Sequence, residues 1–516
     1  MSQDPGLAAA ELQRRAARGA TWSTISVTVS LPLAIAVSVI LARSLGPEQF
    51  ARFAYLTFLV PLLIVLLELG FAPAIIRAGS QAFARGDLAG TRDLLSKAFG
   101  WSLLRLPIVC AVVLVIARPE PAIAVVVVAA LVLLTAGGAI VFSLQVENRG
   151  ATSAKLAFLQ GFASSVSSIV AASVSDSGTT VWAITLASGV AVLPVWLVVA
   201  DPSLRRAALR PRLPRELPEG FWRYGVTATV LALVSTLVFS RSEVVILEAL
   251  GEQQALAVFA LAFGLAQRLT TPVDTLLGPL IPALSAIASA HPERLRPGFG
   301  RALRLSSTAV AFLAGAAFIG TTLAAPVLFG PEYEGTAAVF AALAGVSLLR
   351  SAAQPYIAVA HAVGRLGGLV RANGIALIVD VALAVALIPT LGVWGAVIAN
   401  AVGALLALVL SVRAIPQAGS VRDAGVPTRK LLAVTGGSVA AAYAAGAVGG
   451  TAGPAIGALA AYAVGACAFL TLARIFGGLL RESDSAVLLD VLPSRIARFS
   501  RPFIPVVTSG TATSGP

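Results

Sequence analysis

The chain alternates between long apolar stretches and short polar connections along almost its whole length. About fourteen stretches run for about twenty residues, which is the length of helix that crosses a hydrocarbon core of about 30 Å. Only helices or closed barrels cross lipid without leaving backbone polar groups unpaired. The pattern predicts an all-α integral membrane protein with spans near residues 21–42, 53–71, 99–117, 121–144, 154–175, 180–200, 225–247, 254–276, 305–326, 336–358, 372–390, 393–412, 431–450 and 454–473.

The basic residues fall almost entirely in every second connection. Of the 37 lysines and arginines, three (Arg43, Arg52 and Arg118) lie in the other connections and four lie within spans, which leaves thirty on the side of the N-terminus. The glutamates of the opposite side include Glu248, Glu252, Glu332 and Glu334. The positive-inside rule then predicts both termini in the cytoplasm, which requires an even number of spans.

These positions predict six segments. They are a cytoplasmic N-terminal segment (1–20), an N-lobe of six spans (21–200), a basic cytoplasmic linker (201–224), a C-lobe of six spans (225–412), two further spans (431–473) and a cytoplasmic tail (474–516). The lobes also show a weak internal repeat, because Leu45-Gly46-Pro47-Glu48-Gln49-Phe50 before the second span is similar to Leu250-Gly251-Glu252-Gln253-Gln254 before the eighth. Six spans separate the two copies, as in a parallel repeat of two lobes.

Composition agrees with a membrane protein and narrows the possible partners. The chain is 58% hydrophobic and 12% charged, whereas a soluble domain carries about 25% charged residues. A net charge of +13 would suggest nucleic acid in a soluble protein, but here the basic residues flank apolar spans, so no nucleic-acid partner is expected. Cys110 and Cys467 both lie within spans, which argues against a disulfide framework.

Several kinds of catalytic motif are missing from the sequence. None of the three lysines (Lys97, Lys155 and Lys430) follows the glycine of a Walker A loop, and the two histidines form no H-E-x-x-H motif. There is no G-x-S-x-G elbow and no connection long enough for a catalytic domain. We therefore expect a secondary transporter and not an enzyme, with no cofactor and no metal site.

We select seven of the ionisable residues within the predicted spans as candidates, because charge there is costly and usually faces a bundle interior or a watery cavity. They are Arg105, Arg241, Arg268 and Arg350, which we take as candidate substrate-binding residues, and Glu243, Asp274 and Asp380, which we take as candidate coupling or ion-pair residues. Four arginines against three acids favour a phosphate-bearing substrate, since guanidinium grips phosphate oxygens through two parallel bonds. Alternatives stay open: Arg241 and Glu243 could snorkel, Asp274 could cap a helical segment, and any of the set could form a structural ion pair.

The eighth span is interrupted by Pro272, Pro279 and Pro282. Proline removes a helical hydrogen bond and bends a helix, and interrupted spans often supply the hinges of transporters. These prolines either form a hinge or simply end the helix.

Four segments together resemble a known family. Leu41-Ala42-Arg43-Ser44-Leu45-Gly46-Pro47-Glu48-Gln49-Phe50 is similar to the first-loop signature of Wzx-type polysaccharide flippases, which belong to the MOP superfamily with the MATE exporters and the MurJ lipid II flippases. Three later segments are also similar and come in the family's order: Leu69-Gly70-Phe71-Ala72-Pro73-Ala74-Ile75-Ile76-Arg77, Leu328-Phe329-Gly330-Pro331-Glu332-Tyr333 and Leu391-Gly392-Val393-Trp394-Gly395-Ala396.

The resemblance covers most of residues 15–415 and implies two six-helix lobes around a central cavity, two appended helices and alternating access. It also implies a polyprenyl-diphosphate-linked sugar as cargo. One departure is that many relatives carry an Asp near the end of the seventh span, where this chain has Arg241-Ser242-Glu243.

The sequence therefore predicts a flippase that moves a lipid-linked oligosaccharide, an exopolysaccharide or cell-envelope repeat unit, to the outer leaflet of a bacterial-type plasma (inner) membrane. Residues 1–200 would rock against residues 220–415. Expected partners are the lipid-linked substrate, membrane lipids, and possible polymerase and glycosyltransferase partners. The alternatives are a MATE-like drug/cation antiporter, a lipid II flippase, and a non-transporting membrane scaffold for polysaccharide assembly.

Overall fold

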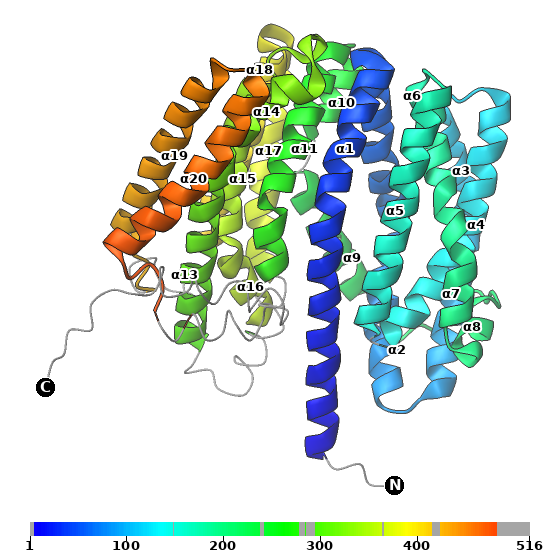
Figure 1. Cartoon of the computed structure of the whole chain (residues 1–516). Coiled ribbons are helices and arrows are strands. Elements are labelled where there is room, and N and C mark those ends of the chain that lie inside the picture. The colour runs from blue at the N-terminus through cyan, green and yellow to red at the C-terminus, as the bar shows by residue number, and fades with distance from the viewer. Residues whose placement is uncertain are drawn as a thin grey trace, which may run out of the picture. The chain divides into compact units, whose positions relative to one another are not determined.

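A computed structural model describes residues 5–147, 149–237, 242–277, 284, 295–363, 366–414, 424–481 and 484. All regular elements among these residues are helical, so the predicted all-α class is confirmed (Figure 1). The chain divides into two compact units, Met1–Leu237 (unit 1) and Val238–Pro516 (unit 2).

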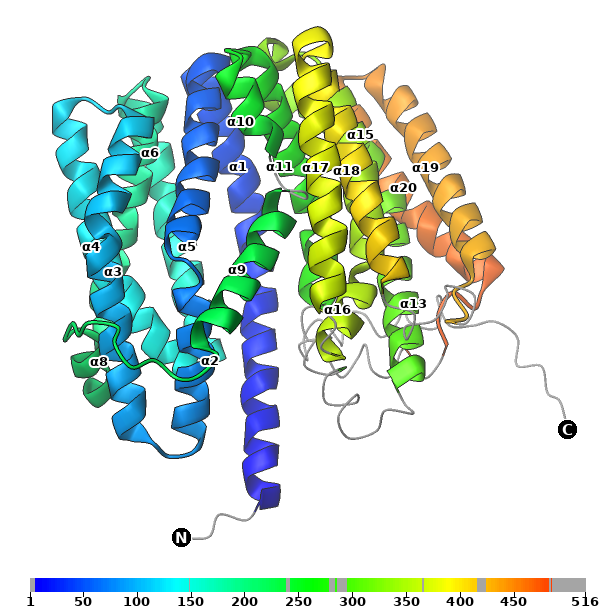
Figure 2. The same ribbon diagram turned by 180° about the vertical axis from the view of Figure 1, so that it is seen from behind.

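Unit 1 begins with α1 (Pro5–Leu67), which contains the first two predicted spans. The helix starts well before residue 21, so part of the predicted N-terminal segment is helical. The two spans meet at Gly46, which has φ 70° and ψ 171° and breaks α1 into two arms, both visible in Figure 2. The rest of the unit consists of α2 (Phe71–Ala84), α3 (Leu88–Ala117), α4 (Pro121–Val146), α5 (Gly150–Val174), α6 (Gly178–Ser188), η1 (Gly189–Val192), α7 (Leu193–Val199), α8 (Pro202–Ala208) and α9 (Phe221–Thr236).

The described elements of unit 2 include a π-helical turn in the ninth predicted span, η4 (Ala314–Phe318). The others are α10 (Ser242–Ala249), α11 (Gln253–Leu277), α13 (Leu295–Leu313), α14 (Ile319–Phe329), η5 (Pro331–Tyr333), α15 (Thr336–Ala352), α16 (Gln354–Ala362), α17 (Leu366–Leu391), α18 (Val393–Arg413), α19 (Thr428–Gly450) and α20 (Pro454–Phe476).

The predicted spans correspond closely to these helices. By length and composition 11 described helices could cross a membrane, or 12 if α15 and α16, which meet at a bend of 42°, count as one span. α1 contains two predicted spans, and α9 and α10 contain the described residues of the predicted span 225–247. The described residues of every predicted span therefore lie mainly on helices.

Some helices extend further than the apolar pattern indicated. α3 begins at Leu88 and not near residue 99, because Asp87 caps it by accepting a hydrogen bond from the Gly90 backbone N–H at 2.8 Å. α13 likewise begins at Leu295 and not near residue 305. Basic residues such as Lys97 and Arg304, which we assigned to connections, therefore lie on helices that continue past the apolar stretch.

The repeated Leu-Gly segments have a common backbone feature. Gly46 and Gly251 both have positive φ, 70° and 74° respectively. Each lies between two predicted spans, where a residue with a Cβ would be strained. The same requirement at both positions accounts physically for the similarity of the two segments.

The boundary between the units falls inside the predicted span 225–247. α9 packs against α2, where a Cβ on Gly225 would lie 2.2 Å from the Gly70 carbonyl oxygen, so it belongs to unit 1 although we began the C-lobe at residue 225. α10 packs against α11 and α17 in unit 2. The span is thus divided between the units.

The linker predicted at residues 201–224 is bound along α3. The Arg212 backbone N–H donates to the Ser96 carbonyl at 3.0 Å, and the Lys97 ammonium donates to the Glu216 carbonyl at 3.2 Å. The Arg212 guanidinium also lies 3.0 Å from an Asp93 carboxylate oxygen. These bonds fix the segment that leads into α9.

The two appended spans, α19 and α20, belong to unit 2. They pack against each other and against η4 and α14. Small residues allow this close approach, since a Cβ on Gly465 would lie 2.4 Å from the Gly315 carbonyl oxygen. The Thr321 hydroxyl and the Tyr462 hydroxyl are hydrogen-bonded at 2.8 Å across the same contact.

Candidate functional site

Two acidic residues from different helices meet inside unit 2. Glu243 on α10 and Asp380 on α17 are both fully buried, with a relative exposure of 0%. The two carboxyl groups interact electrostatically with each other, and Glu243 also interacts with Asn400 of α18. The Ser242 hydroxyl donates to Asp380 Oδ2 at 2.5 Å.

The oxygens of this acid pair are only partly satisfied. Neither oxygen of Glu243, nor Oδ1 of Asp380, has a hydrogen bond of normal geometry within the described part of the chain, and the Asn400 amide nitrogen also has none. Burying carboxylates this way is costly, and two like charges repel. The pair is therefore suited to hold a proton or a small cation between its oxygens, since oxygen atoms are the ligands that hard cations prefer.

Helix packing positions Asp380. α17 and α18 pack closely, and a Cβ on Gly403 of α18 would lie 2.7 Å from the Cβ of Asp380. Gly403 thus leaves the space that the aspartate occupies. The buried Asn373 lies seven residues before Asp380, two turns along the same face of α17.

A second polar group in unit 2 joins α11 to α15. The Ser351 hydroxyl donates to Asp274 Oδ1 at 2.8 Å, and Arg350 interacts electrostatically with the same carboxylate. Arg268 lies on α11, six residues before Asp274. The apolar part of α11 is 72% buried, compared with 17–50% for the other ten described helices that could each cross a membrane, so Arg268 and Asp274 lie on the most buried of these helices. Arg350 lies on α15.

Arg105 of unit 1 has partners from the end of α1. Its Nη1 donates to the Ile64 carbonyl at 3.0 Å, and its Nη2 lies 3.7 Å from Glu68 Oε1. The Trp101 indole N–H donates to the Glu68 carbonyl at 3.3 Å. These contacts favour a structural ion pair over substrate binding as the role of Arg105.

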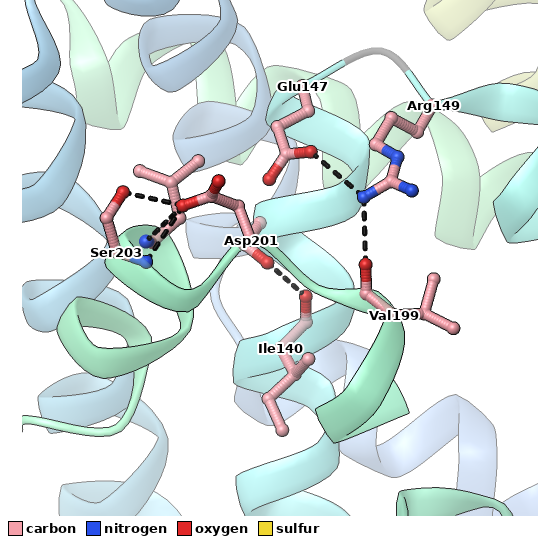
Figure 3. A network of polar contacts seen from close by, with 8 residues as sticks. Ile140, Glu147, Arg149, Val199, Asp201 and Ser203 are labelled. Carbon is pink, nitrogen blue, oxygen red and sulfur yellow. Dashed lines mark hydrogen bonds and ion pairs between the residues drawn. The ribbon is translucent and has the colours of Figure 1, made fainter. Parts of the chain in front are cut away.

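A further polar network in unit 1 contains none of the predicted site residues (Figure 3). Arg149 Nη1 lies 3.4 Å from Glu147 Oε2 and donates to the Val199 carbonyl at 2.9 Å. Asp201 caps α8 by accepting from the Ser203 backbone N–H at 2.8 Å. Burial raises the pKa of Glu147 against the opposing charge of Arg149. The network ties the connection before α5 to the one after α7.

The remaining predicted residues are placed as follows. Pro272 lies inside α11, and the helix continues to Leu277, so this proline does not end the span. Arg241, Pro279 and Pro282 lie outside the described residues. The structure brings Glu243 together with Asp380, and Asp274 with Arg350.

Sequence reasoning missed the neutral partners of these charges. Ser242, Asn400 and Ser351 contribute hydroxyl and amide groups that we did not single out. Asparagine inside an apolar span is itself a usable signal, because polar side chains in membranes usually bond across helices. Glu68, the partner of Arg105, also lay inside the predicted span 53–71 and could have been included.

The fold has clear relatives among solved structures. An inward-facing multidrug resistance MATE family transporter of the MOP superfamily matches with a TM-score of 0.55 at 17% identity, covering 74% of this chain and 93% of that one. The lipid II flippase MurJ in an inward closed conformation matches with a TM-score of 0.63 at 11% identity, covering 88% and 98%. A MATE protein in a bent conformation matches with a TM-score of 0.50 at 15% identity, covering 81% and 96%.

The sequence also matches a family model. No curated protein matches the chain. The model of a family described as polysaccharide biosynthesis protein matches residues 40–338, which is more than half of the chain. The resemblance drawn from the sequence is thus confirmed: the chain is a multi-pass membrane protein that belongs to the polysaccharide biosynthesis protein family and has the fold of the MOP superfamily.

Proposed function

We propose that this protein moves a polyprenyl-diphosphate-linked oligosaccharide from the inner to the outer leaflet of the plasma membrane by alternating access. The observation that carries the proposal is the set of charges in unit 2, in a chain whose family is described by polysaccharide biosynthesis. Arg268 lies on the largely buried α11, and Arg350 of α15 interacts with Asp274 of the same α11. MurJ, one of the relatives in fold, is described as a lipid II flippase.

The arginines are suited to the polar end of such a cargo. A diphosphate carries negative charge and several acceptor oxygens, and guanidinium binds phosphate bidentately. Arg350 already interacts with the Asp274 carboxylate. In this proposal the diphosphate either takes the place of the Asp274 carboxylate beside Arg350 or binds Arg350 together with it. The polyprenyl tail stays in the bilayer.

The Glu243–Asp380 pair supplies the coupling step. Binding of a proton or a cation would relieve the repulsion between the two carboxyl groups and so change how α10, α17 and α18 pack. A transporter needs such a two-state element, because a ligand shifts an equilibrium only by its difference in affinity for the two states. Residues 1–200 would then rock against residues 220–415, with α11 and Pro272 taking up the bend.

The topology completes the proposal. Both termini lie in the cytoplasm by the positive-inside rule, in a bacterial-type inner membrane. The repeat unit must be assembled before it is translocated, which requires glycosyltransferases. It must be polymerised afterwards, so a polymerase is the other expected partner.

The test is a flipping assay with the double variant Arg268→Ala/Arg350→Ala. Proteoliposomes would carry a fluorescent polyprenyl-diphosphate oligosaccharide, and its arrival in the other leaflet would be followed with a membrane-impermeant quencher. We expect the variant to flip about a hundredfold more slowly, because each lost charge-assisted hydrogen bond costs about 1.5–3 kcal/mol.

The matched control is Arg371→Ala/Arg413→Ala, which removes the same charge from two exposed positions of unit 2 and should flip normally. Arg268→Lys and Arg350→Lys cover the case in which the Ala variant misfolds, because lysine keeps the positive charge. They should still slow flipping, because lysine cannot bind phosphate bidentately. Normal flipping by the Ala variant would remove the arginines from the mechanism.

A second candidate is a drug/cation antiporter, favoured by the same acid pair. A site for exchanging cations needs buried carboxyl groups, and Glu243 and Asp380 supply two of them. Transport of a cationic dye instead of the lipid would favour this function.

A further inference from the structure

Unit 1 contains a pocket of about 460 Å³ between α2 and α9. The two helices lie side by side (Figure 2). Arg77 and Gln81 of α2 line one side, and Arg223, Tyr224 and Thr227 of α9 line the other. The connection before α9 closes one end with Pro218, Glu219 and Gly220. None of these residues belongs to the buried charge groups of unit 2.

The pocket has a rigid frame. The backbones of Gly70 and Gly225 approach so closely that no Cβ would fit between them. Beside this contact, the Phe71 ring stacks on Trp101 with centroids 5.3 Å apart and meets Phe221 edge-on at 5.0 Å. The two helices therefore hold the lining residues in fixed relation.

The charges of the lining favour an anion. The Arg77 guanidinium lies over the Tyr224 ring, 4.2 Å from its centroid, a contact that orients the cation without neutralising it. Neither Arg77 nor Arg223 has an ion pair within the described residues, and the lining includes one acid, Glu219. Two guanidinium groups and the Gln81 amide thus line one pocket with hydrogen-bond donors of the kind that bind phosphate oxygens.

An apolar stripe runs along α9 on the helix face next to the one that lines the pocket. Trp222, Val226 and Val230 are spaced four residues apart, so they share one helix face, and they are 39%, 46% and 40% exposed. Trp and Tyr side chains are enriched where membrane meets water. A ligand with a phosphate in the pocket could therefore lay an acyl chain along this stripe.

From this arrangement we propose that the α2–α9 pocket binds the phosphate headgroup of an anionic phospholipid from the cytoplasmic leaflet. The basic linker beside it lies on the cytoplasmic side by the positive-inside rule, where anionic lipids concentrate and basic pockets bind their headgroups. The apolar stripe favours a lipid over a free phosphate ion. The site is separate from the cargo site proposed for unit 2, and its occupancy does not depend on transport.

The test measures lipid binding by the full-length protein with native mass spectrometry. Phosphatidylglycerol or phosphatidylcholine would be titrated onto protein stripped of lipid. We expect the wild-type protein to bind phosphatidylglycerol about tenfold more tightly than phosphatidylcholine, and Arg77→Gln/Arg223→Gln to lose that preference. Arg223→Gln alone should lose part of it, which covers the case in which the double variant fails to fold.

The matched control is Arg85→Gln/Arg210→Gln, which removes two exposed basic residues from the same end of unit 1 but outside the pocket. It should keep the preference. Equal loss in the control, or no preference in the wild-type protein, would overturn the proposal. Displacement of the lipid by an equal concentration of inorganic phosphate would reassign the pocket to a free anion, and tighter arginine-dependent binding of farnesyl diphosphate would reassign it to the cargo; both contradict a phospholipid site.

Discussion

The buried carboxylates of this protein differ in how completely their oxygens are hydrogen-bonded. Asp484 is fully buried and accepts from Arg304 Nε at 2.7 Å and Nη2 at 2.8 Å, while Arg304 Nη1 donates to the Ala424 carbonyl at 2.6 Å. The equally buried Glu243 lacks such bonds among the described residues. A satisfied buried carboxylate holds elements together, whereas an unsatisfied one is suited to bind an ion. We therefore assign stability to the first and coupling to the second.

The Asp484 pairing predicts a dependence of stability on pH. Burial alone would raise the pKa of Asp484, but the hydrogen bonds and charges of Arg304, with Arg301, lower it overall. The folded pKa then lies below the unfolded value of about 3.9. The stabilisation is present above the unfolded pKa and is lost as pH falls through the folded pKa.

Asp484→Asn should lower the unfolding free energy by about 3 kcal/mol at neutral pH, because it leaves Arg304 buried without its partner. Thermal melts in detergent would show this difference from the wild-type protein narrowing below about pH 4. Arg301→Gln is the control, since the Arg301 side chain is 41% exposed and its loss should cost about 1 kcal/mol or less. A difference in stability between Asp484→Asn and the wild-type protein that stays constant down to low pH would contradict the pairing of Asp484 with Arg304.

At the scale of the elements, the apolar pattern predicts where spans lie but not how they connect. The described residues of each apolar stretch lie mainly on helices, because lipid leaves the backbone few alternatives. The helix ends are less predictable, since α3 and α13 extend into polar residues that are capped or paired. The assignment of α9 to unit 1 depends on the Gly70–Gly225 contact, which no local pattern reveals.

The candidate site was predictable only in part for the same reason. Charge inside a span is a strong signal, so Glu243 and Asp380 could be selected from sequence. Their neutral neighbours could not, because Ser242 and Asp380 are 138 residues apart and meet only through helix packing. Serine is also common in spans that merely pack closely.

The turn inside α1 gives a prediction about element geometry. Gly46 has φ 70° and ψ 171°, a region that is almost exclusive to glycine, so Gly46→Ala should cost about 1–3 kcal/mol of stability. Gly138 lies within α4 with open space around its Cβ position, so Gly138→Ala should be neutral or slightly stabilising. Melting temperatures of the two variants would decide this. Equal effects would mean that the Gly46 conformation does not constrain the turn.

At the scale of the whole molecule, the embedded charges are distributed unequally. Glu243, Arg268, Asp274, Arg350 and Asp380 all belong to unit 2, whereas Arg105 of unit 1 is held by Glu68 and the Ile64 carbonyl. The turns at Gly46 and Gly251, by contrast, recur in both units. The buried charged groups that we propose act in transport, however, are concentrated in unit 2.

The most direct measurement follows a polyprenyl-diphosphate oligosaccharide and a cationic dye in the same proteoliposomes under an imposed ion gradient. The account predicts that the lipid crosses in a protein-dependent way while the dye does not. It also predicts that Glu243→Gln slows the lipid about tenfold or more, whereas the exposed control Glu252→Gln does not. Transport of the dye without the lipid, or flipping that is unaffected by Glu243→Gln, would contradict a lipid flippase driven through the buried acid pair.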